Sequence, residues 1–193
     1  MGEIVLDALK ETLIMVFTST IFAVILGFIP AILLTVTAND GLKPNKIIYN
    51  ILDFIVNTLR SFPFVILMVI IVPLTRFIVG KSIGTTAAIV PLTIAAAPFV
   101  ARVIESSLRE VDKGVIEAAK AFGASNFQII FKVMLKEAIP SIMSGITLTI
   151  ISIVGYSAMA GAIGGGGLGD VAIRYGYQRF QTDVMVVTCI ILI

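Results

Sequence analysis

Long apolar blocks, separated by short polar segments, make up most of this chain. The first block, residues 12–37, contains no charged side chain. At about 1.5 Å per helical residue it is long enough to cross a hydrocarbon layer of about 30 Å. Gly27 and Pro30 lie inside this block, where they predict a bend or a close contact with another helix.

The second block begins with an amphipathic segment, residues 47–60. Polar side chains recur there at spacings of three and four residues, which places them on one helical face; they are Asn50, Asp53, Asn57 and Arg60. This face indicates either an approach along the membrane surface or the first turns of a span that face a polar partner. Pro63 ends the segment, and residues 64–79 complete the predicted second span, with Pro73 and Arg76 near its far end.

Two further spans are predicted at residues 83–104 and 138–160. We expect Pro91 and Pro98 to interrupt the first of these. Arg102 and Glu105 lie at its end, three residues apart, so they can form an ion pair on one helical face and anchor the span at the membrane surface.

The last apolar block, residues 184–193, is too short for a complete span, since ten helical residues cover only about 15 Å. The pattern therefore predicts an all-α polytopic membrane protein. We expect a single transmembrane domain over residues 1–193, whose fifth span is truncated.

A polar segment, residues 112–137, stands out between the third and fourth spans. Alanines at three positions favour a helix and leave a shallow surface that another protein can approach closely; they are Ala118, Ala119 and Ala121. Gly123 is suited to end that helix, and Ser125 and Gln128 have the spacing of a capping box that starts the next one. This helical elbow is a candidate docking element, although a solvated loop is an alternative interpretation.

The distribution of Lys and Arg predicts the orientation in the membrane. These residues are more numerous after the first and third spans than at the N-terminus or after the second and fourth spans. The excess places residues 112–137 in the cytoplasm and the N-terminus outside.

Composition excludes several functions. The net charge of +2 gives no reason to expect a nucleic-acid partner, and the absence of His with a single Cys excludes a disulfide within the chain and a His- or Cys-based metal site. No catalytic residue is predicted, because no candidate base accompanies Ser157. Gly164, Gly166 and Gly169 form a G-x-G-x-x-G pattern, but they follow a membrane span, so a flexible turn or a cavity-lining segment is favoured over a nucleotide site.

Energy for any transport is expected from another subunit. A proton- or sodium-coupled carrier usually has ionisable residues near the centres of its spans. The first, third and fourth predicted spans of this chain have none there. The cytoplasmic elbow is the natural place for such a subunit to act.

The elbow resembles a known signature. Glu117-Ala118-Ala119, with Gly123 four residues after the second alanine, is similar to the EAA motif of binding-protein-dependent ABC importer permeases. In that family the elbow is the coupling helix, which docks onto a cytoplasmic ATPase. The resemblance implies ATPase-coupling roles for Glu117, Ala118, Ala119, Lys120, Ala121 and Gly123. Lys136 stands where the family motif has a proline.

Other segments resemble the methionine importer permease subfamily. They are Arg60-Ser61-Phe62-Pro63-Phe64, residues 88–93, residues 97–102 and Gly155-Tyr156-Ser157-Ala158-Met159. The resemblance implies a five-span type I importer permease in a bacterial-type inner membrane, with its N-terminus outside. It also implies a homodimer with two ATPase copies and an extracytoplasmic solute-binding protein, no cofactor, and ATP hydrolysis in the partner rather than in this chain.

The implied function is movement of methionine, or a related amino acid, into the cytoplasm by alternating access. Tyr156, Ser157 and Met159 are candidates for pathway or gate residues, and simple packing of the fourth span is the alternative. Two other functions stay open, namely a permease for another small solute such as a quaternary amine and a membrane scaffold that does not transport.

Overall fold

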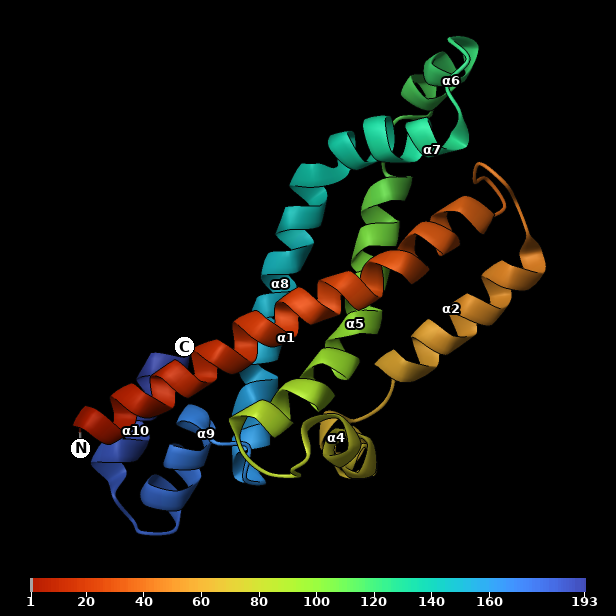
Figure 1. The fold of residues 1–193 in the computed structure, drawn as a ribbon. Helices are drawn as coiled ribbons and strands as arrows, with labels where there is room; N and C mark the ends of the chain where they lie inside the picture. Colours follow the sequence, from red (N-terminus) through yellow and green to blue (C-terminus); the bar gives the residue numbers. More distant parts are fainter. Residues whose placement is uncertain (1) are drawn as a thin grey trace. The chain divides into compact units, whose positions relative to one another are not determined.

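The computed structural model describes residues 2–193, and helices are the only regular secondary structure among them (Figure 1). This confirms the predicted all-α class. In chain order the elements are α1 (Gly2–Thr37), α2 (Lys46–Arg60), α3 (Phe64–Ile70), α4 (Val72–Val79), α5 (Thr85–Arg109), α6 (Lys113–Ala121), α7 (Asn126–Gln128), the π-helix η1 (Ile129–Met134), α8 (Leu135–Ala162), α9 (Gly167–Val171), the π-helix η2 (Ala172–Tyr177) and α10 (Thr182–Leu192).

The described residues form two compact units. The first contains residues up to Ala23 together with Ser61–Ala96 and Thr149–Ile193, and the second contains Val24–Arg60 and Ala97–Leu148. The elbow, residues 112–137, therefore lies wholly within the second unit.

Among residues 2–193, three helical stretches are long and apolar enough to cross a membrane: α1, α5 and the continuous stretch Asn126–Ala162. The pair α2 and α3 is a fourth candidate, broken by a bend of 101°. Helix α10 is apolar but has only 11 residues, as expected for the last apolar block.

The second span differs from its prediction. Helix α2 does end before Pro63, but residues 64–79 form two short helices, α3 and α4, that meet at Ile71. Pro73 lies in the first turn of α4, where its missing N–H costs nothing to the new helix but cannot continue the preceding one. The break is thus a consequence of Pro73, which sequence reasoning placed inside a continuous span.

The prediction that Pro91 and Pro98 interrupt the third span is wrong. Helix α5 continues through both prolines from Thr85 to Arg109. Each proline removes one backbone hydrogen bond, and membrane helices tolerate this loss where neighbouring groups satisfy the freed carbonyl.

Helix α1 begins ten residues before the predicted boundary at Thr12, because polar side chains in its first turns have partners in the first unit. The Lys10 ammonium pairs with Asp7 at 3.0 Å. The Glu11 carboxylate accepts a hydrogen bond of 2.7 Å from the N–H of Gly167, and the Thr12 hydroxyl accepts one of 2.9 Å from Leu168. These contacts fix the glycine-rich turn before α9 against α1.

Within the second unit, α1 and α5 approach closely at Gly27. A Cβ atom on Gly27 would lie 2.6 Å from the carbonyl oxygen of Ala97 and 3.0 Å from the amide nitrogen of Ala101. A backbone cannot yield as a flexible side chain can, so this position admits glycine alone. The close helix contact predicted for Gly27 is confirmed.

We predict that Gly27→Ala destabilises the protein by about 1–3 kcal/mol, the usual cost of overpacking. Gly155→Ala is the matched control, because Gly155 also lies inside a helix and nothing stands within 4 Å of its added Cβ. We expect that control to be neutral or slightly stabilising. Thermal unfolding of the detergent-solubilised protein measures both, and equal melting temperatures for the two variants would contradict the contact.

Candidate functional site: the elbow and its charged network

The first arm of the elbow is α6, which is capped at both ends. The Asp112 carboxylate accepts hydrogen bonds from the N–H groups of Gly114, at 2.7 Å, and Val115, at 3.3 Å. At the other end Gly123 has a φ of 79°, and its N–H donates to the Lys120 carbonyl at 2.9 Å. The N–H of Ala124 donates to the Ala119 carbonyl at 3.1 Å, which completes a Schellman motif. The predicted helix-ending conformation of Gly123 is confirmed.

The second arm of the elbow begins with the predicted capping box at Ser125. The Ser125 N–H donates to the Gln128 side chain at 2.8 Å, and the Gln128 N–H donates to the Ser125 hydroxyl at 3.3 Å. The helix that starts here does not stop at residue 137, where we expected a separate span to begin. It is continuous from Asn126 to Ala162, passing through η1. Lys136 therefore lies inside a helix rather than at the end of one.

The elbow presents an exposed surface. No residue of α6 is buried, and of the predicted coupling residues only Ala119 is half-buried; Glu117, Ala118, Lys120, Ala121 and Gly123 are exposed. Sequence reasoning missed Phe122, which lies directly before Gly123 and is 92% exposed. An aromatic residue in a polar segment, beside a helix-ending glycine, is the signal that identifies it.

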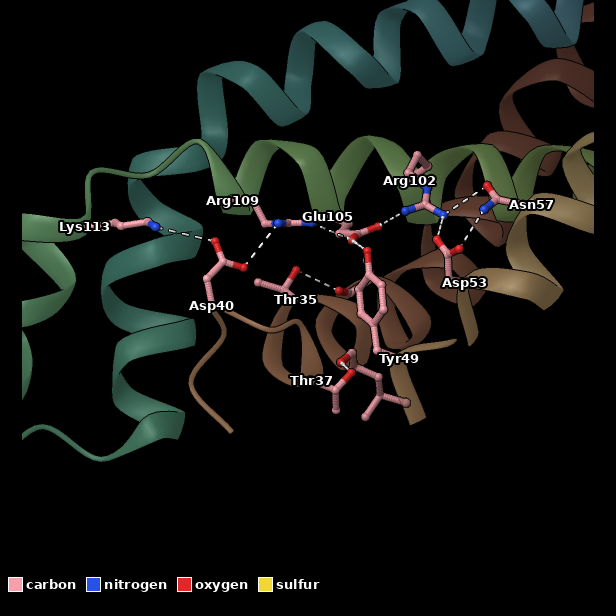
Figure 2. A network of polar contacts seen from close by, with 12 residues as sticks. Thr35, Thr37, Asp40, Tyr49, Asp53, Asn57, Arg102, Glu105, Arg109 and Lys113 are labelled. Carbon is pink, nitrogen blue, oxygen red and sulfur yellow. Dashed lines mark hydrogen bonds and ion pairs between the residues drawn. The ribbon is translucent and has the colours of Figure 1, made fainter. Parts of the chain in front are cut away.

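A charged network adjoins the elbow in the second unit, and its centre is Glu105 (Figure 2). This residue is 1% exposed, yet its carboxylate forms an ion pair of 2.6 Å with Arg102. The Tyr49 hydroxyl of α2 donates to Glu105 at 3.4 Å, and Asp53 of α2 pairs with Arg102 at 2.6 Å. The predicted Arg102–Glu105 pair is confirmed. The polar face of α2 therefore faces the charged side chains of α5. This supports the interpretation that α2 faces a polar partner, rather than an approach along the membrane surface.

The network continues from Glu105 to the first residue of the elbow helix. Arg109 lies 3.6 Å from Glu105 and 3.2 Å from Asp40, and Lys113 of α6 lies 3.6 Å from the other oxygen of Asp40. Sequence reasoning missed Asp40 and Tyr49, whose partners are more than fifty positions away. Little in the sequence marks either residue as part of a network. Asp40 lies in a polar turn and Tyr49 in a helix, and neither setting requires a distant partner.

Asp40 lies between α1 and α2, outside the predicted spans. A hydrogen bond from its own backbone, followed by the nearby charges of Arg109 and Lys113, holds the pKa of this carboxyl below its ordinary value of 3.8, although partial burial acts in the opposite direction. Its contribution to stability is therefore complete above the ordinary pKa, and it is lost as the pH falls through the lowered value of the folded protein.

The three pathway candidates, all in the first unit, have different surroundings. The Tyr156 ring stacks on Phe64, with centroids 4.9 Å apart and planes inclined by 14°. Ser157 is buried, and its hydroxyl donates to the Val154 carbonyl of its own helix at 2.7 Å. Met159 is 49% exposed. Tyr156 and Met159, three residues apart, lie on the same side of α8, whereas the Ser157 hydroxyl is used within the helix.

The chain is similar to known proteins along its whole length. Residues 23–193 match the model of a family described as "Binding-protein-dependent transport system inner membrane component". The chain is 51% identical to the probable D-methionine transport system permease protein MetI of Vibrio cholerae, over all of this chain and 85% of that protein. It is 47% identical to the methionine import system permease protein MetP of Bacillus subtilis, over 83% of this chain and 72% of that protein.

A solved structure is also similar. It shows inward-facing conformations of the MetNI methionine ABC transporter, and one of its chains matches with a TM-score of 0.97 and 45% identity. The match covers all of this chain and 89% of that one.

We predict that Glu105→Ala destabilises the protein by about 3 kcal/mol, because it leaves Arg102 and Arg109 without the buried carboxylate between them. Lys10→Ala is the control, since its ion pair with Asp7 is exposed and is expected to contribute less than about 1 kcal/mol. Denaturation followed by helical circular dichroism measures both. A Glu105 variant as stable as the Lys10 variant would show that the network does not hold the unit together.

Proposed function

Because the chain belongs to the family of binding-protein-dependent transport system inner membrane components, we propose that it is the permease of an ATP-driven importer of methionine or a related amino acid. The observation that carries the proposal is the elbow. It is exposed, capped on both sides of Gly123, and joined without a break to a membrane-length helix. Such an element can receive a displacement from a cytoplasmic partner and pass it to a span.

The assembly proposed for this function contains two copies of the chain, two cytoplasmic ATPase subunits and an extracytoplasmic solute-binding protein. Few polar side chains lie within the spans, so a single copy offers little lining for an aqueous pathway, and a second copy is needed to enclose one. ATP hydrolysis belongs to the partner. The elbow faces the cytoplasm and the N-terminus faces outside, in accordance with the distribution of Lys and Arg.

Each residue type on the elbow has a physical role in docking. Ala118, Ala119 and Ala121 allow a close approach of the partner, and Glu117 and Lys120 provide charges for orientation. The exposed Phe122 ring is the anchor, because burying an aromatic side chain in a partner's groove contributes much of the energy of a small interface.

The charged network connects the docking element with the spans. Lys113, the first residue of α6, pairs with Asp40. Asp40 also pairs with Arg109 of α5, which in turn pairs with Glu105, so the start of the elbow is connected to α5. A movement of α6 therefore acts on α5 through charges and on the fourth span through the continuous helix. In alternating access these two routes drive the spans between inward- and outward-facing states.

Tyr156 and Met159 are proposed to contact the substrate or to gate its pathway. Tyr156 is half-buried and Met159 exposed, so both have surface to offer to a ligand. A thioether substrate gains mildly favourable contacts from an aromatic ring and from another sulfur-containing side chain. The role of Ser157 is to support this segment of α8, since its hydroxyl is used within the helix.

Reconstitution tests the proposed function directly. The chain, purified with its ATPase and placed in proteoliposomes with the solute-binding protein, is expected to accumulate methionine only when ATP is supplied. ATP-dependent accumulation of a quaternary amine instead of methionine would identify another substrate. Recruitment of the ATPase without any uptake would make the chain a scaffold.

We predict that Gly123→Val uncouples ATP hydrolysis from uptake. A β-branched residue is strained by roughly 1–2 kcal/mol or more at a φ of 79°, so the turn between the two arms changes shape. Nothing lies within 4 Å of an added Cβ, so the effect is one of backbone conformation and not of collision. The measurement is methionine taken up per ATP hydrolysed.

Gly123→Asn is the matched control for this prediction. Asparagine adopts the left-handed conformation far more readily than valine, so we expect it to retain most of the coupling. Equal coupling ratios for the valine, asparagine and native proteins would show that the conformation of Gly123 has no part in transmission.

A further inference from the structure

An open groove of about 380 Å³ runs along one side of α5 in the second unit. Its walls come from α5, from the first half of α8 and from the last residue of α2, and they include several polar side chains. The residues that matter for its chemistry are Arg60, Phe99, Arg102, Ser106, Glu110 and Ser144. Ser106, Glu110 and Ser144 are exposed. Polar groups on a span avoid lipid, so this face borders water or protein.

Two guanidinium groups line the groove, and that of Arg60 is exposed and makes no ion pair among the described residues 2–193. Its charge lies 5.7 Å from the centre of the Phe99 ring. Arg102 spends its terminal nitrogens on Asp53 and Glu105, but its Nε is shielded from solvent without a hydrogen-bond partner. That nitrogen is covered by the chain's own atoms, so the guanidinium that a ligand in the groove can reach is that of Arg60.

The unpaired guanidinium of Arg60 calls for an anion, and the fork of a guanidinium matches a carboxylate best. The remaining walls complete a site for an amino acid. Ser106 and Ser144 present hydroxyl oxygens that accept from an ammonium group, and Phe99 provides an apolar face for a side chain. A simple inorganic anion would have no use for that apolar face.

The charges also give the groove a direction. Glu110 follows Arg102 by eight residues, about 12 Å along α5, and it stands two residues before the elbow. Its carboxylate accepts a hydrogen bond of 3.1 Å from Ser141, which in turn accepts from Ser107 at 2.9 Å. The groove is therefore basic at its Arg60 end and acidic at its Glu110 end.

We infer that this groove is a transit site for the transported amino acid, with the exposed Arg60 binding its α-carboxylate. The inference rests on the proposed function and adds to it a place where the substrate is held between its delivery and its release. It also assigns a role to Arg60, which the charged network leaves unpaired.

The test uses the complete transporter, namely this chain with its ATPase and solute-binding protein, in proteoliposomes made of phosphatidylcholine alone. Arg60→Gln keeps the length of the side chain and removes its charge. We expect it to lower methionine uptake per ATP hydrolysed about tenfold, the effect of losing one charge-assisted interaction of about 1.4 kcal/mol. Arg60→Lys, which retains the charge, is expected to restore most of the uptake. Arg76→Gln, an exposed arginine of α4 outside the groove, is the control and is expected to behave like the native chain.

Several results would overturn the inference. Native uptake by Arg60→Gln would show that no carboxylate is held there. A loss of uptake in both Arg60 variants, together with a lowered unfolding temperature, would make Arg60 a structural residue. A defect that appears only when an anionic phospholipid is added to the vesicles would assign the site to a lipid phosphate. No methionine uptake by the native transporter would overturn the proposed function itself, and this inference with it.

Discussion

A carboxylate removed from water determines the arrangement of the second unit. Glu105 lies on a helix that otherwise fits a hydrocarbon environment, and a bare charge there is prohibitively unfavourable. The chain surrounds it with Arg102, Arg109 and the Tyr49 hydroxyl. Those groups need partners of their own, so Asp53 and Asp40 are drawn in, and with them α2 and the turn after α1. One buried charge thus fixes the register of two helices and reaches the elbow at Lys113.

Close backbone contacts set the second constraint. Membrane helices gain little from the hydrophobic effect when they associate, so they depend on packing at short range. Gly27 allows α1 to meet the backbone of α5, and Gly145 of α8 leaves room for the Val103 side chain of α5. Because α5 has close contacts on both sides, Arg109 at its end is held in place. Arg109 and Lys113 of α6 both pair with Asp40.

Local features of the sequence predicted the elbow well. The cap at Gly123 and the box of Ser125 and Gln128 depend on residues at most five apart, so their chemistry can be read along the chain. The Arg102–Glu105 pair is local for the same reason. The partners Tyr49 and Asp53 could not be predicted, because only the fold brings α2 to α5. The prediction for Pro91 and Pro98 was wrong because proline, which breaks helices in water, is tolerated in membrane helices where neighbouring groups satisfy the freed backbone carbonyls.

The π-helical stretch η1 separates the helical turn that follows the elbow from the span that it continues into. Hydrogen bonds between residues five apart widen the turn and insert surplus backbone, so the faces of α7 and α8 are out of phase with one another. The ring of Phe131, within η1, has its centroid 4.4 Å from that of Phe127 in α7 and 6.3 Å from that of Phe28 in α1. Because of this phase offset, the face of α7 that follows the elbow does not continue in line along α8, and the two ends of the continuous helix present differently oriented faces to their neighbours.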